Sequence, residues 1–343
     1  MSKPPRQPRR NLHGVVFLDK PVGLSSNDAL QKVKRLFRAD KAGHTGTLDP
    51  LATGLLPLCF GAATKFSQVS LDADKRYTAT LKLGQTTTTS DAEGEVLQTR
   101  PVTPEQVNAE TIAAACAAFV GEIDQVPPMH SALKHEGKAL YEYARQGIEI
   151  ERPARRVTIH GIDILQWQDD VLTIDVRCTK GTYIRTLAQD IGERLGCGAH
   201  LIGLRRTGSG GVSVDRAHTL EQLLAMSEAE RDALLQPPDA LLVDWPEVLL
   251  SEEDAGRFLS GLRRRLKLPD MDAVRVYGPL PSGSPGVQES GRAPRILLGS
   301  GHVKAGELIP GRLLSPLEVQ ALLVQVAQAA EPNVASATPA PVL

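Results

Sequence analysis

Residues 43–57 read Gly-His-Thr-Gly-Thr-Leu-Asp-Pro-Leu-Ala-Thr-Gly-Leu-Leu-Pro, and this run constrains the chain more than any other. Its three glycines let the backbone take a positive φ or approach a ligand closely. Pro50 fixes its own φ and biases Asp49 towards an extended conformation. A carboxylate among apolar residues in such a loop is a candidate nucleophile or general base. From these residues alone, a turn or capping role for Asp49 is the commoner interpretation.

The hydrophobic pattern along the chain predicts an α+β protein. Alternation over 75–83 places Tyr77 and Leu83 on the same face of a strand. Ser26 or Asn27 is expected to cap the helix that follows the first turn. Further strands are expected over 14–18, 55–60 (or a short helix there), 157–165, 171–178, 273–277, 295–298 and 306–312, and further helices over about 103–120, 179–196, 219–235 and 251–262.

The length of 343 residues allows about two domains, at roughly 100–200 residues each. Pro237-Pro238 and Trp245-Pro246 indicate that a boundary is near. Segments rich in Pro, Gly, Ser or basic residues are expected to be disordered. The expected divisions are a disordered basic arm (1–11), a main domain (12–245), a small β-domain (246–320) with a flexible loop (278–294), and a helix end with a disordered tail (321–343).

Charge is distributed unevenly along the chain, although the net charge is only −1. The first 65 residues contain 11 Lys or Arg against 4 Asp or Glu, whereas residues 214–260 contain 3 Arg against 11 acids. A basic amino-terminal region suits a phosphate-rich partner. Charges that merely solvate helix faces would give the same count, so both interpretations stay open at this point.

The four cysteines form no C-x-x-C pair, so the sequence indicates neither a zinc site nor a disulfide framework. We therefore expect no metal site and a reducing, cytoplasmic location. No apolar run reaches the roughly 18 residues of a membrane span.

Several motifs together resemble the TruB family of tRNA pseudouridine synthases. Residues 43–54 match the family's catalytic motif closely, and the resemblance is strong over about 14–207. Over 249–314 the chain weakly resembles a PUA-like RNA-binding β-domain. The other matching motifs are Lys20-Pro-x-Gly-x-Ser-Ser26, Lys75-Arg76-Tyr77, Lys180-Gly-Thr-Tyr-Ile-Arg-Thr186 and Leu204-Arg-Arg-Thr207.

The resemblance implies a pseudouridine synthase fold, with a mixed, mainly antiparallel sheet flanked by helices and an inserted RNA-binding thumb over about 124–152. It implies that the protein isomerises the uridine at position 55 in the T-loop of tRNA. This reaction breaks the N1–C1′ bond and makes a C5–C1′ bond, so no cofactor is expected. The base must leave its loop and enter a pocket. The expected partner is the T-arm stem-loop of tRNA, and we expect a monomer.

By resemblance, Asp49 is the attacking carboxylate, and Arg185 pairs with it. A cation at this position would keep Asp49 ionised. Independently, Arg185 falls in the first turn of its helix, where the dipole disfavours a cation, which suggests a specific anionic partner. The resemblance also implies that Tyr77 stacks on the target uracil and assists catalysis, that Tyr183 lines the uracil pocket, and that Leu204 is the pocket leucine. Attack on C1′, attack on C6 and a glycal route all stay open.

Four more residues complete the set that the resemblance implies. His44 is expected to contact the RNA and to fill space left by the extruded base. Lys20 belongs to a supporting element beside the site; it could contact a phosphate, but we favour the structural role. The family commonly has two acids in the loop after the Tyr77 strand. Thr88 replaces the first of them here, so only Asp91 is expected to order the site.

Alternative interpretations exist for these residues and for the whole chain. Without the resemblance, a core position is the default for Tyr77, and a core or capping role for His44. A non-catalytic RNA-binding or tRNA-folding protein would keep the basic patches and the carboxy-terminal module, yet could dispense with Asp49. A phosphate-loop hydrolase, suggested by the glycines of 43–47, lacks its G-x-x-x-x-G-K-[ST] motif here.

Overall fold

The computed structural model describes residues 8–279 and 295–330, and its largest element is a ten-stranded sheet. The strands run in the order β14 (His218–Thr219), β1 (Gly14–Lys20), β3 (Thr53–Phe60), β12 (Ala199–Ser209), β4 (Lys75–Leu83), β11 (Val171–Cys178), β10 (Arg155–Gln168) and β7 (Gly121–Gln125), with β2 (Ala42–His44) beside β3 and β13 (Val212–Ser213) beside β12. Neighbours are antiparallel, except that β1 with β14 and β3 with β12 are parallel. The predicted mixed, mainly antiparallel sheet is confirmed.

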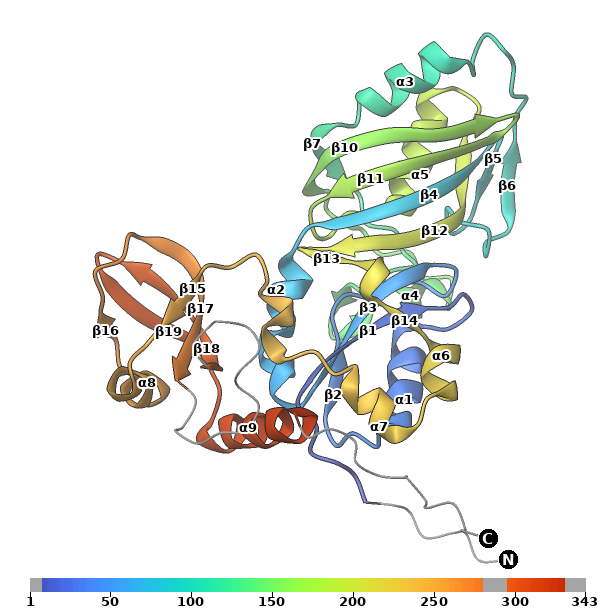
Figure 1. Ribbon diagram of the computed structural model, residues 1–343. Helices are drawn as coiled ribbons and strands as arrows, with labels where there is room; N and C mark the ends of the chain where they lie inside the picture. The colour runs from blue at the N-terminus through green and yellow to red at the C-terminus, as the bar shows by residue number, and fades with distance from the viewer. Residues whose placement is uncertain (1–7, 280–294, 331–343) are drawn as a thin grey trace, which may run out of the picture.

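Helices flank both halves of this sheet, as predicted (Figure 1). In the half formed by β4, β10 and β11, Leu187 and Leu81 belong to one buried apolar cluster. In the half formed by β1 and β3, Val33 and Leu56 belong to another. The main-sheet helices and helical turns are α1 (Ser26–Leu36), η1 (Gly61–Phe66), α2 (Ser67–Asp72), α3 (Ala109–Ala117), α5 (Ile184–Arg194), η2 (Val214–Arg216), α6 (Leu220–Ala225), α7 (Glu228–Ala233) and η3 (Pro238–Leu241).

Two small hairpins extend from the main sheet. The first, β5 (Gln85–Thr87) with β6 (Val96–Thr99), carries Asp91 in its connecting loop. The second, β8 (Lys134–His135) with β9 (Lys138–Ala139), lies between β7 and β10 and leads into α4 (Leu140–Ala144). It falls within 124–152, the segment for which a thumb is predicted.

The cap of α1 differs from the prediction. Ser25, rather than Ser26 or Asn27, caps the helix, because its hydroxyl accepts a hydrogen bond from the Asp28 N–H at 3.1 Å. The buried Ser26 hydroxyl instead bonds Leu48, accepting from its N–H at 2.7 Å and donating to its carbonyl at 3.1 Å. The helix start is therefore attached to the loop that carries the organising motif.

The helix predicted over 103–120 begins later than expected. Asn108 and Thr111 form a capping box, so α3 starts at Ala109. The Thr103 carbonyl accepts the Val107 N–H at 2.9 Å in an isolated turn. Thr103 and Asn108 can each cap a helix, and the helix begins after Asn108, where the capping box forms.

The helix predicted over 219–235 is two short helices, α6 and α7. Met226 leaves the helical conformation with a ψ of 149°, and the hydroxyl of Ser227 then caps α7. The described end of the predicted basic arm is also held in place, since the Arg10 guanidinium donates to the Asp232 carboxylate at 3.0 Å. The rest of that arm, residues 280–294 of the predicted loop and the tail beyond residue 330 lie outside the described residues.

A second sheet follows in the carboxy-terminal part and is consistent with the predicted PUA-like domain (Figure 1). Its strands run in the order β15 (Glu247–Leu249), β17 (Met271–Pro279), β18 (Arg295–Lys304), β19 (Glu307–Leu313) and β16 (Arg264–Arg265), accompanied by α8 (Glu252–Leu259) and α9 (Pro316–Ala330). One apolar cluster contains Phe17 and Phe66 of the first part together with Phe258 and Leu298 of the second. Because this cluster crosses residue 245, the division into 12–245 and 246–320 stays a prediction.

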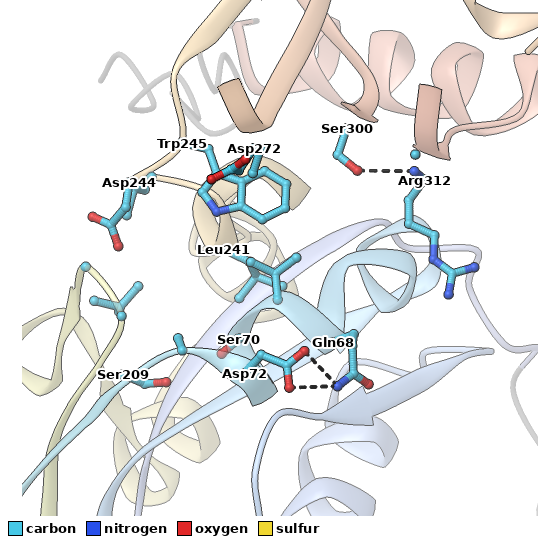
Figure 2. Close-up of a pocket in the computed structure, with 18 of the residues that line it drawn as sticks. Gln68, Ser70, Asp72, Ser209, Leu241, Asp244, Trp245, Asp272, Ser300 and Arg312 are labelled. Carbon is cyan, nitrogen blue, oxygen red and sulfur yellow. Dashed lines mark hydrogen bonds between the residues drawn. The ribbon is translucent and has the colours of Figure 1, made fainter. Parts of the chain in front are cut away.

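A cavity of about 1000 Å³ lies between the two parts (Figure 2). Gln68 and Asp72 of α2 and Ser209 of β12 line it from one side, and Trp245 and Arg312 line it from the other. Asp49 is not among its lining residues, so this cavity is separate from the organising motif. None of the helices in the described ranges is both long enough and apolar enough to cross a membrane.

Candidate active site

Asp49 lies in the loop between β2 and β3, and backbone contacts fix this loop at several points. The Gly23 N–H donates to the Pro50 carbonyl at 2.8 Å, and the Asp49 carbonyl accepts the Ala52 N–H at 3.0 Å. Gly54 has a φ of 98°, and a Cβ there would lie 2.3 Å from a carbonyl oxygen of β12, so the return into β3 requires glycine. The loop therefore presents Asp49 from a rigid frame, with 38% of its side chain exposed.

Arg185, at the start of α5, is the counter-ion of this carboxylate. Its Nε lies 3.0 Å from Asp49 Oδ2, and its Nη1 lies 3.3 Å from Asp91 Oδ2. It also donates to the Thr89 carbonyl at 3.2 Å and to the His130 carbonyl at 2.6 Å. The guanidinium is buried and joins the Asp49 loop, the Asp91 loop and the segment that leads to α4.

The pKa of the Asp49 carboxyl is raised above its ordinary value, because burial disfavours the charged form more than the neighbours favour it. Arg185 opposes this rise, while the charge of Asp91 adds to it. From the sequence, Arg185 is expected to keep Asp49 ionised. In the structure, the charge of Arg185 lowers the pKa of this carboxyl, but by less than burial raises it.

Two cavities meet at Asp49 and Arg185, which line both. The first, of about 380 Å³, is also lined by Tyr77, Tyr183 and Leu204. A cavity of this size, with two tyrosines and a leucine in its wall beside charged and hydroxyl side chains, is suited to a small planar ligand. It brings together five of the residues that the sequence singled out.

The second cavity, of about 630 Å³, contains two further residues of the predicted set, His44 and Asp91. Burial lowers the pKa of His44 and so favours its neutral form, and its Nδ1 has no hydrogen-bond partner among the described residues. Ser131 and Ala132, from the segment before α4, line both cavities. The described residues contain no group of His, Cys, Asp and Glu that could hold a metal ion.

Lys20 lies outside both cavities. Its side chain is fully buried, and its ammonium group donates to the carbonyls of Pro21 at 2.9 Å and Leu24 at 2.6 Å. Burial lowers its pKa to about 8. This geometry supports the structural role that we favoured over a phosphate contact, because the charge is directed at the turn before α1.

Sequence reasoning missed two residues that hold the site together. The Gln125 side chain accepts from the Tyr183 N–H at 3.0 Å and donates to the Tyr183 carbonyl at 3.3 Å, and so fixes the residue that precedes α5. Arg206 lines the smaller cavity and is 1% exposed. Both contacts are long-range, so no local pattern indicates them. The alternation of β12 does, however, require Arg205 and Arg206 to face opposite ways.

Comparison with protein families gives two matches. A model described as TruB family pseudouridylate synthase (N terminal domain) matches residues 34–184, and one described as tRNA pseudouridylate synthase B C-terminal domain matches residues 185–243. Among similar proteins, the tRNA pseudouridine synthase B of Cupriavidus pinatubonensis is 57% identical over 91% of this chain and 98% of its own length. That of Ralstonia nicotianae is 58% identical, with the same coverage.

Among solved structures, a chain of a Cbf5-Nop10-Gar1 complex is similar in fold. Its TM-score is 0.65 at 24% identity, with 90% of this chain and 87% of that chain covered. A chain of an H/ACA RNP bound to a substrate RNA gives a TM-score of 0.64 at 22% identity, with 89% and 86% covered.

Proposed function

The chain belongs to the TruB family, whose members convert uridine in tRNA to pseudouridine, and we propose from this premise that Asp49 is the attacking group of the reaction and that the substrate is the uridine at position 55 of the T-loop. One observation supports the first proposal most: Asp49 is partly exposed at the junction of two cavities, with Arg185 3.0 Å away. The rest of the site is consistent with a flipped base in the smaller cavity.

The reaction places clear demands on this cavity. The N1–C1′ bond must break, the uracil must turn, and C5 must bond to C1′, so the base needs a space that holds it without fixing one edge permanently. The aromatic residues Tyr77 and Tyr183 supply faces on which an unstacked base packs, and Leu204 supplies an apolar wall. These contacts offset the unstacking cost of a few kcal/mol.

Asp49 has to be anionic to attack, and Arg185 favours this state against the effect of burial, which raises the pKa of the carboxyl. Arg185 has no acidic proton to give at neutral pH, so its role is electrostatic and positional. Asp91 holds the other side of the guanidinium, and through it the orientation towards Asp49.

The decisive experiment measures tritium release from a tRNA transcript labelled at C5 of its uridines. We expect Asp49→Asn to release none while it still binds the transcript, and Asp40→Asn, at an exposed position, to behave as the wild type. A transcript with cytidine at position 55 should release none with the wild-type enzyme. Release by Asp49→Asn would refute the attacking role, and release from the cytidine transcript would refute the position.

The same experiment separates the enzyme from a non-catalytic RNA-binding protein, which would bind tRNA equally with either residue at position 49 and release no tritium. We also propose that residues 124–152 act as an RNA-binding thumb, since Ser131 and Ala132 border both cavities. A cytoplasmic monomer is proposed as well; its four cysteines are free and buried. Light scattering of the purified protein tests the monomer.

A further inference from the structure

Arg206 lies on β12 directly beneath the smaller cavity. Its backbone pairs with Tyr77 of β4 on one side and with Gly54 of β3 on the other. The register with β4 shifts immediately after Arg206, which marks a β-bulge or a similar irregularity. Such irregularities re-aim side chains near functional sites. The side chain is 1% exposed and heads the set of the largest fully buried side chains.

The guanidinium connects three parts of the site. Its Nε donates to the Leu55 carbonyl at 2.7 Å, and its Nη2 donates to the Gly46 carbonyl at 3.3 Å, at the start of the Asp49 loop. Tyr77 lies directly opposite Arg206 on β4, so the two side chains share one face of the sheet, and both line the smaller cavity. Gly46 has a φ of 84°, and a Cβ there would lie 3.2 Å from Nη1, so the loop packs closely on the guanidinium.

Arg206 differs from Arg185 and from the adjacent Arg205 because it forms no salt bridge with any residue that the structure describes. Arg185 has two carboxylates, and the adjacent Arg205 has Asp19 at 2.7 Å. A charge buried without a counter-ion is costly, and its hydrogen bonds here go only to neutral oxygens. A negative charge that develops on a neighbouring group during the reaction would therefore be stabilised here.

We propose that Arg206 is a positioning residue of the isomerisation, which orients the Tyr77 hydroxyl and holds the Gly46 end of the Asp49 loop from beneath the cavity. This inference rests on the proposed participation of Tyr77. Because a guanidinium has donors and no acceptor, the O–H proton of Tyr77 cannot point at Arg206 and is left to point elsewhere. Whenever that proton passes to a substrate atom, the negative charge left on the oxygen faces a cation that is already in place.

Arg206 lowers the pKa of the Tyr77 phenol, whereas other groups around this side chain raise it. Burial raises the pKa of its phenol, and the Cys178 thiol of β11 and the Asp49 carboxylate add to the rise. Lys75, at the start of β4, lines the same cavity, but its ammonium group donates to the carbonyls at the end of α2. Arg206 is therefore the cation that lies opposite Tyr77 on the neighbouring strand.

A double-mutant cycle tests the inference. We expect Arg206→Lys, which keeps the charge but loses the planar fork, to reduce the single-turnover rate by about 10- to 100-fold with tRNA binding unchanged. Arg205→Lys is the matched control, because its side chain is half-exposed and pairs with Asp19, and it should retain the wild-type rate. In a Tyr77→Phe background, Arg206→Lys should change the remaining rate less than about threefold, since the group through which it acts is gone.

Equal losses in the two backgrounds would overturn the inference and leave a purely structural role. A wild-type rate for Tyr77→Phe alone would instead overturn the participation of Tyr77, which is a different failure. A second measurement places 3-fluorotyrosine at position 77 and follows its titration by ¹⁹F NMR. The pKa of this phenol should be higher in Arg206→Met than in the wild type, and an unchanged value in a folded variant would contradict the proposal.

Discussion

Replacement of Arg185 by methionine should destabilise the fold as well as stop the reaction. The guanidinium is 6% exposed and satisfies Asp91, whose side chain is 2% exposed, together with the carbonyls of Thr89 and His130. Loss of one partner of a buried ion pair costs about 3–5 kcal/mol, because a charge is left buried without compensation. Asp49 contributes less than Asp91, because its side chain is 38% exposed and therefore the less buried of the two carboxylates.

At about 2–4 °C per kcal/mol for a domain of this size, Arg185→Met should lower the melting temperature by roughly 6–20 °C. Circular dichroism during a thermal scan measures the change. Arg156→Met is the control, because its ion pair with Asp124 is largely exposed, and such pairs contribute about 0–1 kcal/mol.

A second substitution separates the stability effect from the catalytic one. Arg185→Met with Asp91→Asn removes the uncompensated charge, so this double variant should regain more than half of the lost melting temperature. It should still release no tritium, because Asp49 lacks its counter-ion. An unchanged melting temperature for Arg185→Met would refute the burial argument, and restored turnover in the double variant would refute the role assigned to the Asp49–Arg185 pair.

Two further predictions concern groups that support the site. Gln125→Glu replaces the amide donor that faces the Tyr183 carbonyl with a second acceptor, and should lower single-turnover activity about 10-fold, while Gln166→Glu on the exposed end of β10 should not. Burial lowers the pKa of Lys75 from 10.5 to about 8, so between these values the unfolded chain holds a proton that the folded one has released. The unfolding free energy of the wild type should therefore rise relative to Lys75→Met from about pH 8 to 10.5 in urea titrations, and a constant difference would contradict this.

The sequence predicted most of the fold because its signals are local and agree with one another. The alternation around Tyr77 produces β4, whose residues Ala79 and Leu81 are fully buried. Where two local signals compete, the prediction was wrong. In the run of Ser25 and Ser26, either hydroxyl suits a helix cap, and the contact with Leu48, more than 20 residues away, decides between them. Local propensity contains no information about that contact.

For the candidate site too, the sequence identified the residues but not how they are brought together. The motifs single out Asp49 and Arg185, yet the cavity exists only because separate strands, a helix start and the segment before α4 converge on it. The pKa of Asp49 follows from that convergence, since burial outweighs the charge of its partner. The sequence predicted the partner, but it did not predict the burial that reverses the net effect.

Arg205 and Arg206 show most clearly what the sequence alone cannot predict. They are identical and adjacent, and strand alternation requires that one faces each side of β12, but nothing in either residue decides which. The decision comes from the neighbours of β12, which pairs in parallel with β3 and in antiparallel with β4. Arg206 pairs across the strands with Tyr77 and lines the smaller cavity, whereas Arg205 pairs with Asp19. The motif Leu204-Arg-Arg-Thr207 therefore contains one arginine for the surface and one for the site, and only the strand order distinguishes them.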